Sequence, residues 1–446
     1  MLLRHKIFGK PVQTASSAAI AKSCQIRSFS KHLKAFATID PQNLSSSDKG
    51  FNLVKGEWVP SKQYMELVDP LKGGTMVKIP DTQVDEIQPF VESLQECPKT
   101  GLHNPFKNKE RYLMLSEVNR RVVECMHDKE VFDFFVKSVQ RVAPKSKAQT
   151  TAEIQVTLDF FENFCGDRVR FLAEAQRMPG DHGGQFNTSY RFPYGPVGVI
   201  TPFNFPIEIP VLQMMGALYM GNKPLVKGDS RTSIVLEQWI RMLHHCGLPK
   251  EDMDFIHADG PVMEKILKQA DAKMTLFTGS SKVGEHLVKS LKGKVRLEDG
   301  GYDWKILGPD VPSRQQDIDF VAYTCDQDAY AHTGQKCSAQ SILFMHRNWR
   351  KSGLLEKIKA QAARRSLSDL TIGPVLSWNN ERIKAHLDAI LELDGATVLF
   401  GGAPLKNHTI PKCYGAWEPT AIFVPLKHFK TQKKRNLLTT ELFGPF

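Results

Sequence analysis

Strand and helix patterns alternate from Gly195 onward, and this alternation constrains the fold more than any other feature of the chain. Short apolar runs are typical of buried strands, and each is followed by a longer segment with helical spacing. The expected strands are 195–201, 223–227, 253–257, 273–277 and 294–297, and the expected helices are 207–220, 232–246, 262–270 and 281–291. Short connections between such elements indicate a doubly wound parallel sheet, an α/β fold that binds ligands at the carboxyl ends of its strands.

The same alternation resumes after the glycine pair Gly300-Gly301 and predicts a second α/β unit that starts near residue 302. Its expected strands are 304–307, 338–345, 397–400 and 421–424, and its expected helices are 316–330, 350–363 and 379–391. Before Gly195 we expect short strands in 51–80, helices in 109–139 and 151–176, and a hairpin near 178–194. At 446 residues, the chain is long enough for two such domains.

The first 29 residues differ in composition from the rest of the chain. They contain five basic residues and no acidic residue, and they are rich in serine and alanine. This composition predicts a mitochondrial transit peptide at 1–29, cleaved before Ser30, with a disordered basic N-terminus as the alternative. Under either interpretation we expect residues 1–40 to lie outside the fold.

Charge, hydropathy and cysteine spacing exclude several classes of protein. Without the five basic residues of 1–29, the formal net charge of +11 falls to +6, and no basic-aromatic module for nucleic acid is present. No run of eighteen apolar residues predicts a membrane span. The eight cysteines are scattered without a C-x-x-C pair, which favours reduced thiols over a zinc site or a disulfide framework, and we expect no bound metal.

One of these cysteines, Cys337, lies in the stretch Gly334-Gln335-Lys336-Cys337-Ser338, directly before a predicted strand. A partly exposed thiol beside the cation of Lys336 is placed to have a lowered pKa and to act as a nucleophile. The alternative is that Cys337 is a small buried apolar residue.

Polar residues at other strand ends are candidates for the same site. Asn204, in Pro202-Phe203-Asn204-Phe205-Pro206, has an amide that could donate a hydrogen bond to an oxyanion. Glu298, before Gly300-Gly301, is a candidate general base. The turn with Gly279, Ser280 and Gly284, the strand end at Lys227, and Glu441 with Phe443 are candidates for nucleotide binding. Solvated turn residues remain the alternative for each of them.

The order of these five motifs resembles the NAD(P)-dependent aldehyde dehydrogenase superfamily. Pro-Phe-Asn-Phe-Pro, Phe-Thr-Gly-Ser, Leu-Glu-x-Gly-Gly, Gly-Gln-Lys-Cys-Ser and Glu-Leu-Phe-Gly-Pro follow one another between residues 202 and 445. Within the superfamily, the stretch around Cys337 looks most like the plant mitochondrial glutamate γ-semialdehyde dehydrogenase branch. The resemblance implies a nucleotide-binding domain at 40–301 and a catalytic domain at 302–446, incomplete at its C-terminus.

The resemblance also implies a role for each motif residue. Cys337 attacks the aldehyde and forms a thiohemiacetal and then a thioester, Asn204 stabilises the oxyanion, and Glu298 activates water. Lys336 and Ser338 flank the nucleophile on the substrate side. The residues that hold the cofactor are Lys227, Gly279, Ser280, Gly284, Glu441 and Phe443. The implied reaction is the NAD-dependent oxidation of L-glutamate γ-semialdehyde to L-glutamate in proline catabolism, in the mitochondrial matrix.

Some questions stay open on the sequence alone. The cofactor is NAD, but Ser230 leaves NADP open, because no acidic residue stands there to reject the 2′-phosphate. Two alternatives to the implied reaction remain. One is the oxidation of another small semialdehyde, and the other is a catalytically silent product that binds NAD or partner subunits. The family's segment after Gly-Pro supplies an intersubunit strand, so the expected homo-oligomer is in doubt for a chain ending at Phe446. Asp299 adds a negative charge beside Glu298, which raises a carboxyl pKa if Glu298 and Asp299 are both buried.

Overall fold

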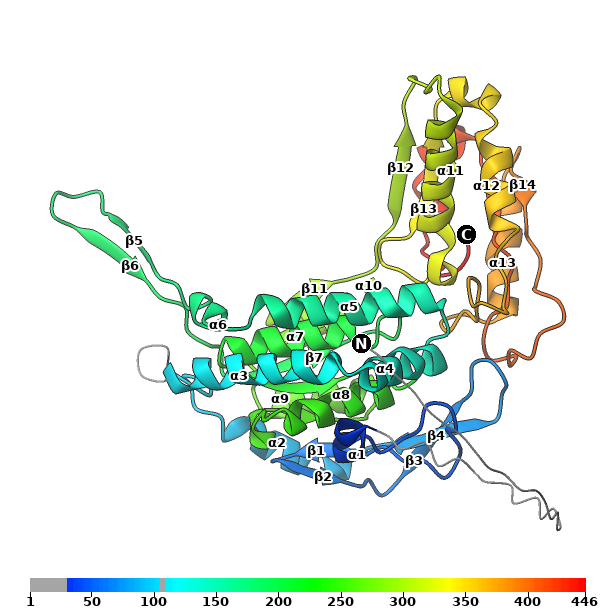
Figure 1. Ribbon diagram of the computed structural model, residues 1–446. Coiled ribbons are helices and arrows are strands. Elements are labelled where there is room, and N and C mark those ends of the chain that lie inside the picture. The colour runs from blue at the N-terminus through cyan, green and yellow to red at the C-terminus, as the bar shows by residue number, and fades with distance from the viewer. Residues whose placement is uncertain (1–29, 105–108) are drawn as a thin grey trace, which may run out of the picture.

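A seven-stranded sheet organises the lower part of the molecule in Figure 1, within the residues that the computed structural model describes, 30–104 and 109–446. The strand order is β11-β10-β7-β8-β9-β1-β2. The strands are β1 (Asn52–Val54), β2 (Glu57–Val59), β7 (Pro196–Ile200), β8 (Lys223–Lys227), β9 (Asp254–Phe255), β10 (Met274–Thr278) and β11 (Val295–Glu298). The strands from β11 to β9 run parallel, whereas β1 is antiparallel to β9 and β2. The predicted parallel sheet is confirmed, with the short N-terminal strands extending one edge.

Helices cover both faces of this sheet, because its parallel strands are apolar on both sides. On one face lie α3 (Lys109–Met126), α4 (Lys129–Val142), α5 (Lys147–Asn163), α7 (Glu208–Tyr219) and α8 (Ser233–His245). On the other face lie α2 (Gln88–Gln95), α9 (Gly260–Gln269) and α10 (Ser281–Ser290). Neighbouring residues of β8 point to opposite faces: Val226 packs in the first hydrophobic cluster and Leu225 in the second.

The chain joins the fold earlier than its composition predicts. Helix α1 (Lys31–Phe36) begins after Ser30, whose hydroxyl accepts a hydrogen bond from the Leu33 N–H. Leu33 and Phe36 are buried, and the Phe36 ring stacks on that of Phe135 of α4 at a centroid distance of 6.0 Å. The expectation that residues 1–40 lie outside the fold is therefore wrong for 30–40. The transit peptide expected at 1–29 lies outside the described residues.

Local breaks divide the long helical segments that the sequence predicts before Gly195. The segment 109–139 forms α3 and α4, because Asp128 caps a new helix by accepting the Glu130 N–H. The segment 151–176 ends as a helix at Asn163, before Gly166 in the left-handed conformation, and α6 (Arg168–Phe171) follows. Strands β5 (Gln176–Pro179) and β6 (Phe186–Ser189) then pair in the predicted hairpin, which projects far from the sheet (Figure 1).

A second part of the molecule stands above the sheet in Figure 1. Its first strands are the parallel pair β12 (Asp303–Leu307) and β13 (Gln340–Met345), connected through α11 (Gln315–Tyr330). The remaining elements are α12 (Leu354–Ala362), α13 (Asn380–Leu391), the antiparallel pair β14 (Thr397–Phe400) and β15 (Ala421–Phe423), and α14 (Gln432–Leu438). A separate hairpin of β3 (Tyr64–Val68) and β4 (Thr75–Pro80) approaches this part, since the Leu71 carbonyl accepts a hydrogen bond from Thr409. Strand β13 starts two residues later than predicted, after the turn that carries Cys337.

Candidate active site

The segment between α11 and β13 carries the cysteine that the sequence singles out. Before it, the buried residues His332 and Thr333 have φ values of 53° and 56°, which are uncommon for side chains with a Cβ. Gly334 follows with φ 70°, and a Cβ there would lie 1.9 Å from the carbonyl oxygen of Gly444. Only glycine fits this position, so the path of the chain into Cys337 is fixed by close packing against residue 444.

Buried hydrogen bonds then hold Gln335, two residues before the thiol. Its side-chain carbonyl accepts the Leu376 N–H at 2.7 Å, and its amide nitrogen donates to the Pro374 carbonyl at 3.0 Å. Its own carbonyl accepts a hydrogen bond from the Asn204 amide at 3.1 Å. Asn204 is 2% exposed and lies just after β7, so one direct contact connects the sheet edge with the cysteine loop.

The Glu298 loop reaches Cys337 from another strand of the sheet. Glu298 ends β11, and a Cβ on Gly301 would lie 2.9 Å from the Cys337 carbonyl oxygen, so the two loops touch. Burial, then the charge of Glu298 and a hydrogen bond to its carboxylate, raise the pKa of the half-buried Cys337 thiol. The lowered pKa expected from Lys336 is therefore wrong, because the carboxylate and burial outweigh the neighbouring cation. The Glu298 carboxylate thus faces the Cys337 thiol.

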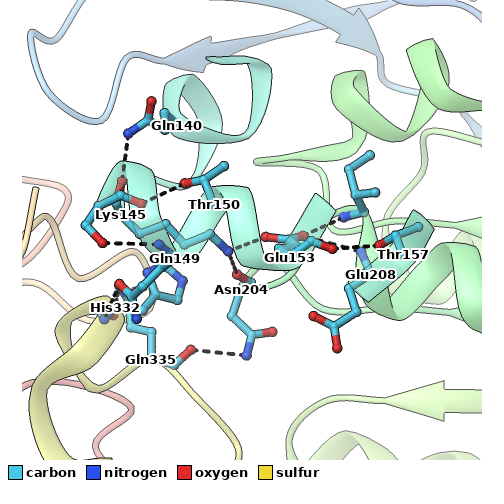
Figure 2. Close-up of polar contacts among 12 residues, drawn as sticks. Gln140, Lys145, Gln149, Thr150, Glu153, Thr157, Asn204, Glu208, His332 and Gln335 are labelled. Carbon is cyan, nitrogen blue, oxygen red and sulfur yellow. Dashed lines mark hydrogen bonds and ion pairs between the residues drawn. The ribbon is translucent and has the colours of Figure 1, made fainter. Parts of the chain in front are cut away.

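A buried ion pair lies behind Asn204 and was not predicted from the sequence (Figure 2). The Lys145 and Glu153 side chains are both 0% exposed, and their charged atoms are 2.5 Å apart. Lys145 Nζ also donates to the Asn204 carbonyl at 2.9 Å and lies 4.3 Å from the centre of the Phe205 ring. Glu153 accepts the Ile207 N–H at 3.0 Å. The pair thus fixes the backbone from the Asn204 carbonyl to the Ile207 N–H.

One sequence signal points to this pair. Glu153 stands on the inward face of a predicted helix, one residue before the buried Ile154 and one turn before the buried Thr157. A charge at such a position needs a partner. Lys145 precedes the helix and belongs to no motif, so only the folded chain identifies it as that partner. Burial lowers the pKa of Lys145, but the Glu153 carboxylate favours its charged form.

The predicted nucleotide-binding residues line the carboxyl edge of the sheet. Lys227 ends β8, and the only hydrogen bond that its ammonium makes among the described residues goes to the Gly228 carbonyl at 3.2 Å, while burial lowers its pKa. The Gly279 N–H donates to the Glu298 carbonyl at 3.1 Å, which places the turn beside the catalytic candidate. Ser280 is the N-cap of α10, and its hydroxyl makes no cap hydrogen bond. Gly284, one turn into α10, is buried against Leu297.

Glu441 reaches this edge from the second part of the molecule. A Cβ on Gly300 would lie 2.7 Å from a Glu441 carboxylate oxygen. Burial, followed by the charges of Asp303 and Asp299, raises the pKa of Glu441 to about 7. No hydrogen bond or ion pair within the described chain engages this carboxylate, so it is free to accept hydroxyl groups such as those of a ribose. Phe443 follows and packs edge-on against Phe203 at 5.7 Å.

The remaining candidates on the substrate side are more open to solvent. Lys336 is half-buried and Ser338 is exposed, on either side of Cys337. Glu298 and Asp299 are both exposed, and the charge of Asp299 adds to burial and Asp303 in raising the pKa of Glu441. The structure therefore brings all five motif segments to one place, through contacts of backbone and side chains.

Two other kinds of site are absent from residues 30–104 and 109–446. No group of three or more histidine, cysteine, aspartate or glutamate side chains there could hold a metal ion. No helix in these ranges combines the length and apolar character needed to cross a membrane.

With this geometry, the fold and its motif segments define a class. The aldehyde dehydrogenase family matches residues 58–446, and the chain belongs to this family. Like other members, it is an NAD(P)-dependent aldehyde dehydrogenase.

Within the family, the chain is similar to particular proteins. The chain is 51% identical to mitochondrial Δ1-pyrroline-5-carboxylate dehydrogenase 12A1 of Arabidopsis thaliana, over 99% of this chain and 80% of the relative. It is 54% identical to the Linum usitatissimum protein named "Probable aldehyde dehydrogenase", over 94% of this chain and 76% of that one. Among solved structures, betaine aldehyde dehydrogenase of Staphylococcus aureus in complex with NAD+ superposes with a TM-score of 0.73 at 19% identity, covering 93% of this chain and 78% of that chain.

Proposed function

We propose that this chain oxidises L-glutamate γ-semialdehyde, the open form of Δ1-pyrroline-5-carboxylate, to L-glutamate with NAD, in proline catabolism. The observation that carries the choice of substrate is the 51% identity to the Arabidopsis enzyme over nearly the whole chain. The convergence of Cys337, Glu298 and Asn204 supports the chemistry, because a thiol, a base and an amide donor are what the oxidation of an aldehyde through a thioester needs.

Each residue of the site has a separate role in the proposed reaction. Glu298 takes the proton of the Cys337 thiol, whose raised pKa keeps it protonated until the base acts. The thiolate attacks the aldehyde carbon, and the oxyanion accepts hydrogen bonds from the Cys337 N–H and from the Asn204 N–H that Gln335 does not use. Glu298 is exposed and passes the thiol proton to solvent; after oxidation to the thioester, its carboxylate activates the water that releases the acid.

The nucleotide-binding residues fit the expected cofactor. The Glu441 carboxylate and the Lys227 ammonium are both free of side-chain partners among the described residues, and a dinucleotide offers hydroxyls and phosphates to them. The start of α10 at Ser280 presents free N–H groups to a phosphate. When bound, NAD supplies the hydride acceptor. We propose NAD with NADP left open, because Asp229 is held by Arg231 and Ser230 is neutral.

We further propose a mitochondrial matrix location and a division into two functional domains. The basic composition of 1–29 and the printed name of the Arabidopsis relative support the location. The seven-stranded sheet at 40–301 binds the nucleotide, and 302–446 carries the nucleophile. Import of a reporter fused to residues 1–29 tests the first proposal; a reporter that stays outside mitochondria refutes it.

The function is tested by NADH formation with a panel of semialdehydes. We expect L-glutamate γ-semialdehyde to give a higher kcat/KM than succinate or malonate semialdehyde. The Cys337→Ala variant should bind NAD and produce no NADH. A different preferred semialdehyde refutes the substrate, and activity retained by Cys337→Ala refutes the nucleophile.

A further inference from the structure

A carboxylate outside the five motifs lies beside the proposed site without a partner. Glu208 is the first residue of α7, four residues after Asn204. Its backbone N–H donates to Glu153 at 3.3 Å, which fixes its main chain. Its carboxylate is partly buried and makes no hydrogen bond or ion pair within the described residues. A partly buried carboxylate without a hydrogen-bond or ion-pair partner is energetically unfavourable, so we expect a ligand to supply that partner.

The direction of the side chain indicates where that ligand lies. Figure 2 shows the Glu208 carboxylate extending away from the Lys145–Glu153 pair, to the same side as the Asn204 amide. Lys145 cannot neutralise it, because its ammonium is engaged by Glu153 and the Asn204 carbonyl. Glu208 therefore faces the space in which the aldehyde is proposed to react.

The charges around Glu208 define what this space accepts. Burial, then the charge of Glu153, raises the Glu208 pKa; Lys145 and Lys336 oppose this, and Glu298 adds to it. Lys336 thus offers a cation and Glu208 an anion within one neighbourhood, next to Cys337. A ligand that matches both must carry an anion and a cation close together.

We propose that Glu208 binds the α-ammonium group of the substrate while Lys336 binds its α-carboxylate, so that the site selects an amino-acid semialdehyde. This inference rests on the proposed function and assigns the substrate's amino group to a residue outside the motifs. It also gives Glu208 a role distinct from the stabilisation that any acid gives to the first turn of a helix.

Two analogues separate the two charges of the substrate. Glutarate semialdehyde keeps the carboxylate and lacks the amino group, and 4-aminobutanal keeps the ammonium on the same carbon and lacks the carboxylate. For the wild-type chain we expect kcat/KM to be highest for L-glutamate γ-semialdehyde. In Glu208→Gln it should fall roughly 10–100-fold for the two amino aldehydes and stay within about twofold for glutarate semialdehyde.

Matched variants distinguish recognition from structure. Glu208→Asp should recover part of the activity on amino aldehydes. Glu110 is an exposed acid of α3, and Glu110→Gln should leave kcat/KM unchanged for all three aldehydes. An equal fall for all three aldehydes in Glu208→Gln refutes the inference, because it indicates a role in folding or in the chemical step.

Product binding tests the inference independently of turnover. By isothermal titration, the wild-type chain should bind L-glutamate more tightly than glutarate, and Glu208→Gln should abolish this difference. Equal binding of the two acids by the wild-type chain overturns the inference even when L-glutamate γ-semialdehyde is oxidised. Absence of oxidation with a retained preference for L-glutamate refutes the proposed function alone.

Discussion

The two parts of the molecule bury their strands to very different degrees. In the seven-stranded sheet, β7 and β8 are buried at every position except the last. In the second part, β12 has no buried position, with Trp304 64% and Ile306 61% exposed. A cavity of about 1130 Å³ runs along β13, β15 and the end of the chain near Glu441. Cys337, the proposed nucleophile, therefore belongs to the less densely packed part, and its loop contacts the sheet edge.

The largest expected effect concerns the buried ion pair at that edge. Lys145→Met leaves Glu153 buried without its cation, which should lower the free energy of unfolding by about 3–5 kcal/mol. It also removes the hydrogen bond to the Asn204 carbonyl, so kcat should fall while KM changes little. Chemical denaturation and steady-state kinetics measure the two effects.

The second part offers a matched pair, Arg365 with Asp326, at 6% and 3% exposure. Arg365→Met should also destabilise the chain, but should leave kcat unchanged at temperatures where the protein is folded. If Lys145→Met, like Arg365→Met, lowered stability and left kcat unchanged, the contact with Asn204 would have no positioning role.

Cavity-creating substitutions sharpen the contrast in packing. Leu225→Ala in β8, at 0% exposure, should cost about 2–5 kcal/mol. Ile306→Ala in β12, at 61% exposure, should stay within about 0.5 kcal/mol. Denaturant unfolding of both variants checks the difference. Equal losses would show that β12 is covered in solution by something that contributes to stability.

Gly334 tests how tightly the cysteine loop depends on its packing. Gly334→Ala places a Cβ against the Gly444 carbonyl at positive φ and should cost roughly 2–3 kcal/mol, with loss of NADH formation. Gly353→Ala is the control, because it has φ 76° and no atom within 4 Å of its Cβ. The control should cost about 1 kcal/mol and remain active. Similar activity of the two variants would contradict the fixed path into Cys337.

The smallest effect is a pH dependence at Glu441. Its pKa is raised to about 7 in the folded chain, so its contribution to stability is present in acid and is lost as pH rises through 7. The ionised form is the better hydrogen-bond acceptor for a ribose, so NAD binding should tighten about threefold between pH 6 and pH 8. Titration calorimetry should show this slope in the wild-type chain and not in Glu441→Gln.

Sequence patterns predicted the central sheet well for a physical reason. Runs such as Leu225-Val226 are apolar at successive positions because both faces of a parallel strand are covered, and the turns at their ends carry polar residues. The placement of Asn204 and Glu298 at one edge follows from this topology, since they follow or end parallel strands of one sheet, whereas Cys337 precedes β13 in the second part and meets that edge through contacts between the two parts.

Other features depend on contacts that no local pattern contains. Burial of Phe36 against Phe135 joins residues far apart in the chain, and composition alone placed α1 outside the fold. Burial, and after it the Glu298 carboxylate, raise the pKa of Cys337, although its sequence neighbour Lys336 is a cation. Lys145 likewise acquires its role only through the approach of Glu153 and the Asn204 backbone.

The contact between Gly334 and Gly444 has a consequence for how the protein is made. The loop that carries Cys337 packs against a residue that is synthesised more than a hundred positions later, whereas the β-strands from β7 to β11 are complete before Cys337 leaves the ribosome. Domains generally fold as units in the order of their synthesis. The nascent chain can thus form its seven-stranded sheet first, and the loop that carries Cys337 reaches its packed path only after Gly444 has been synthesised.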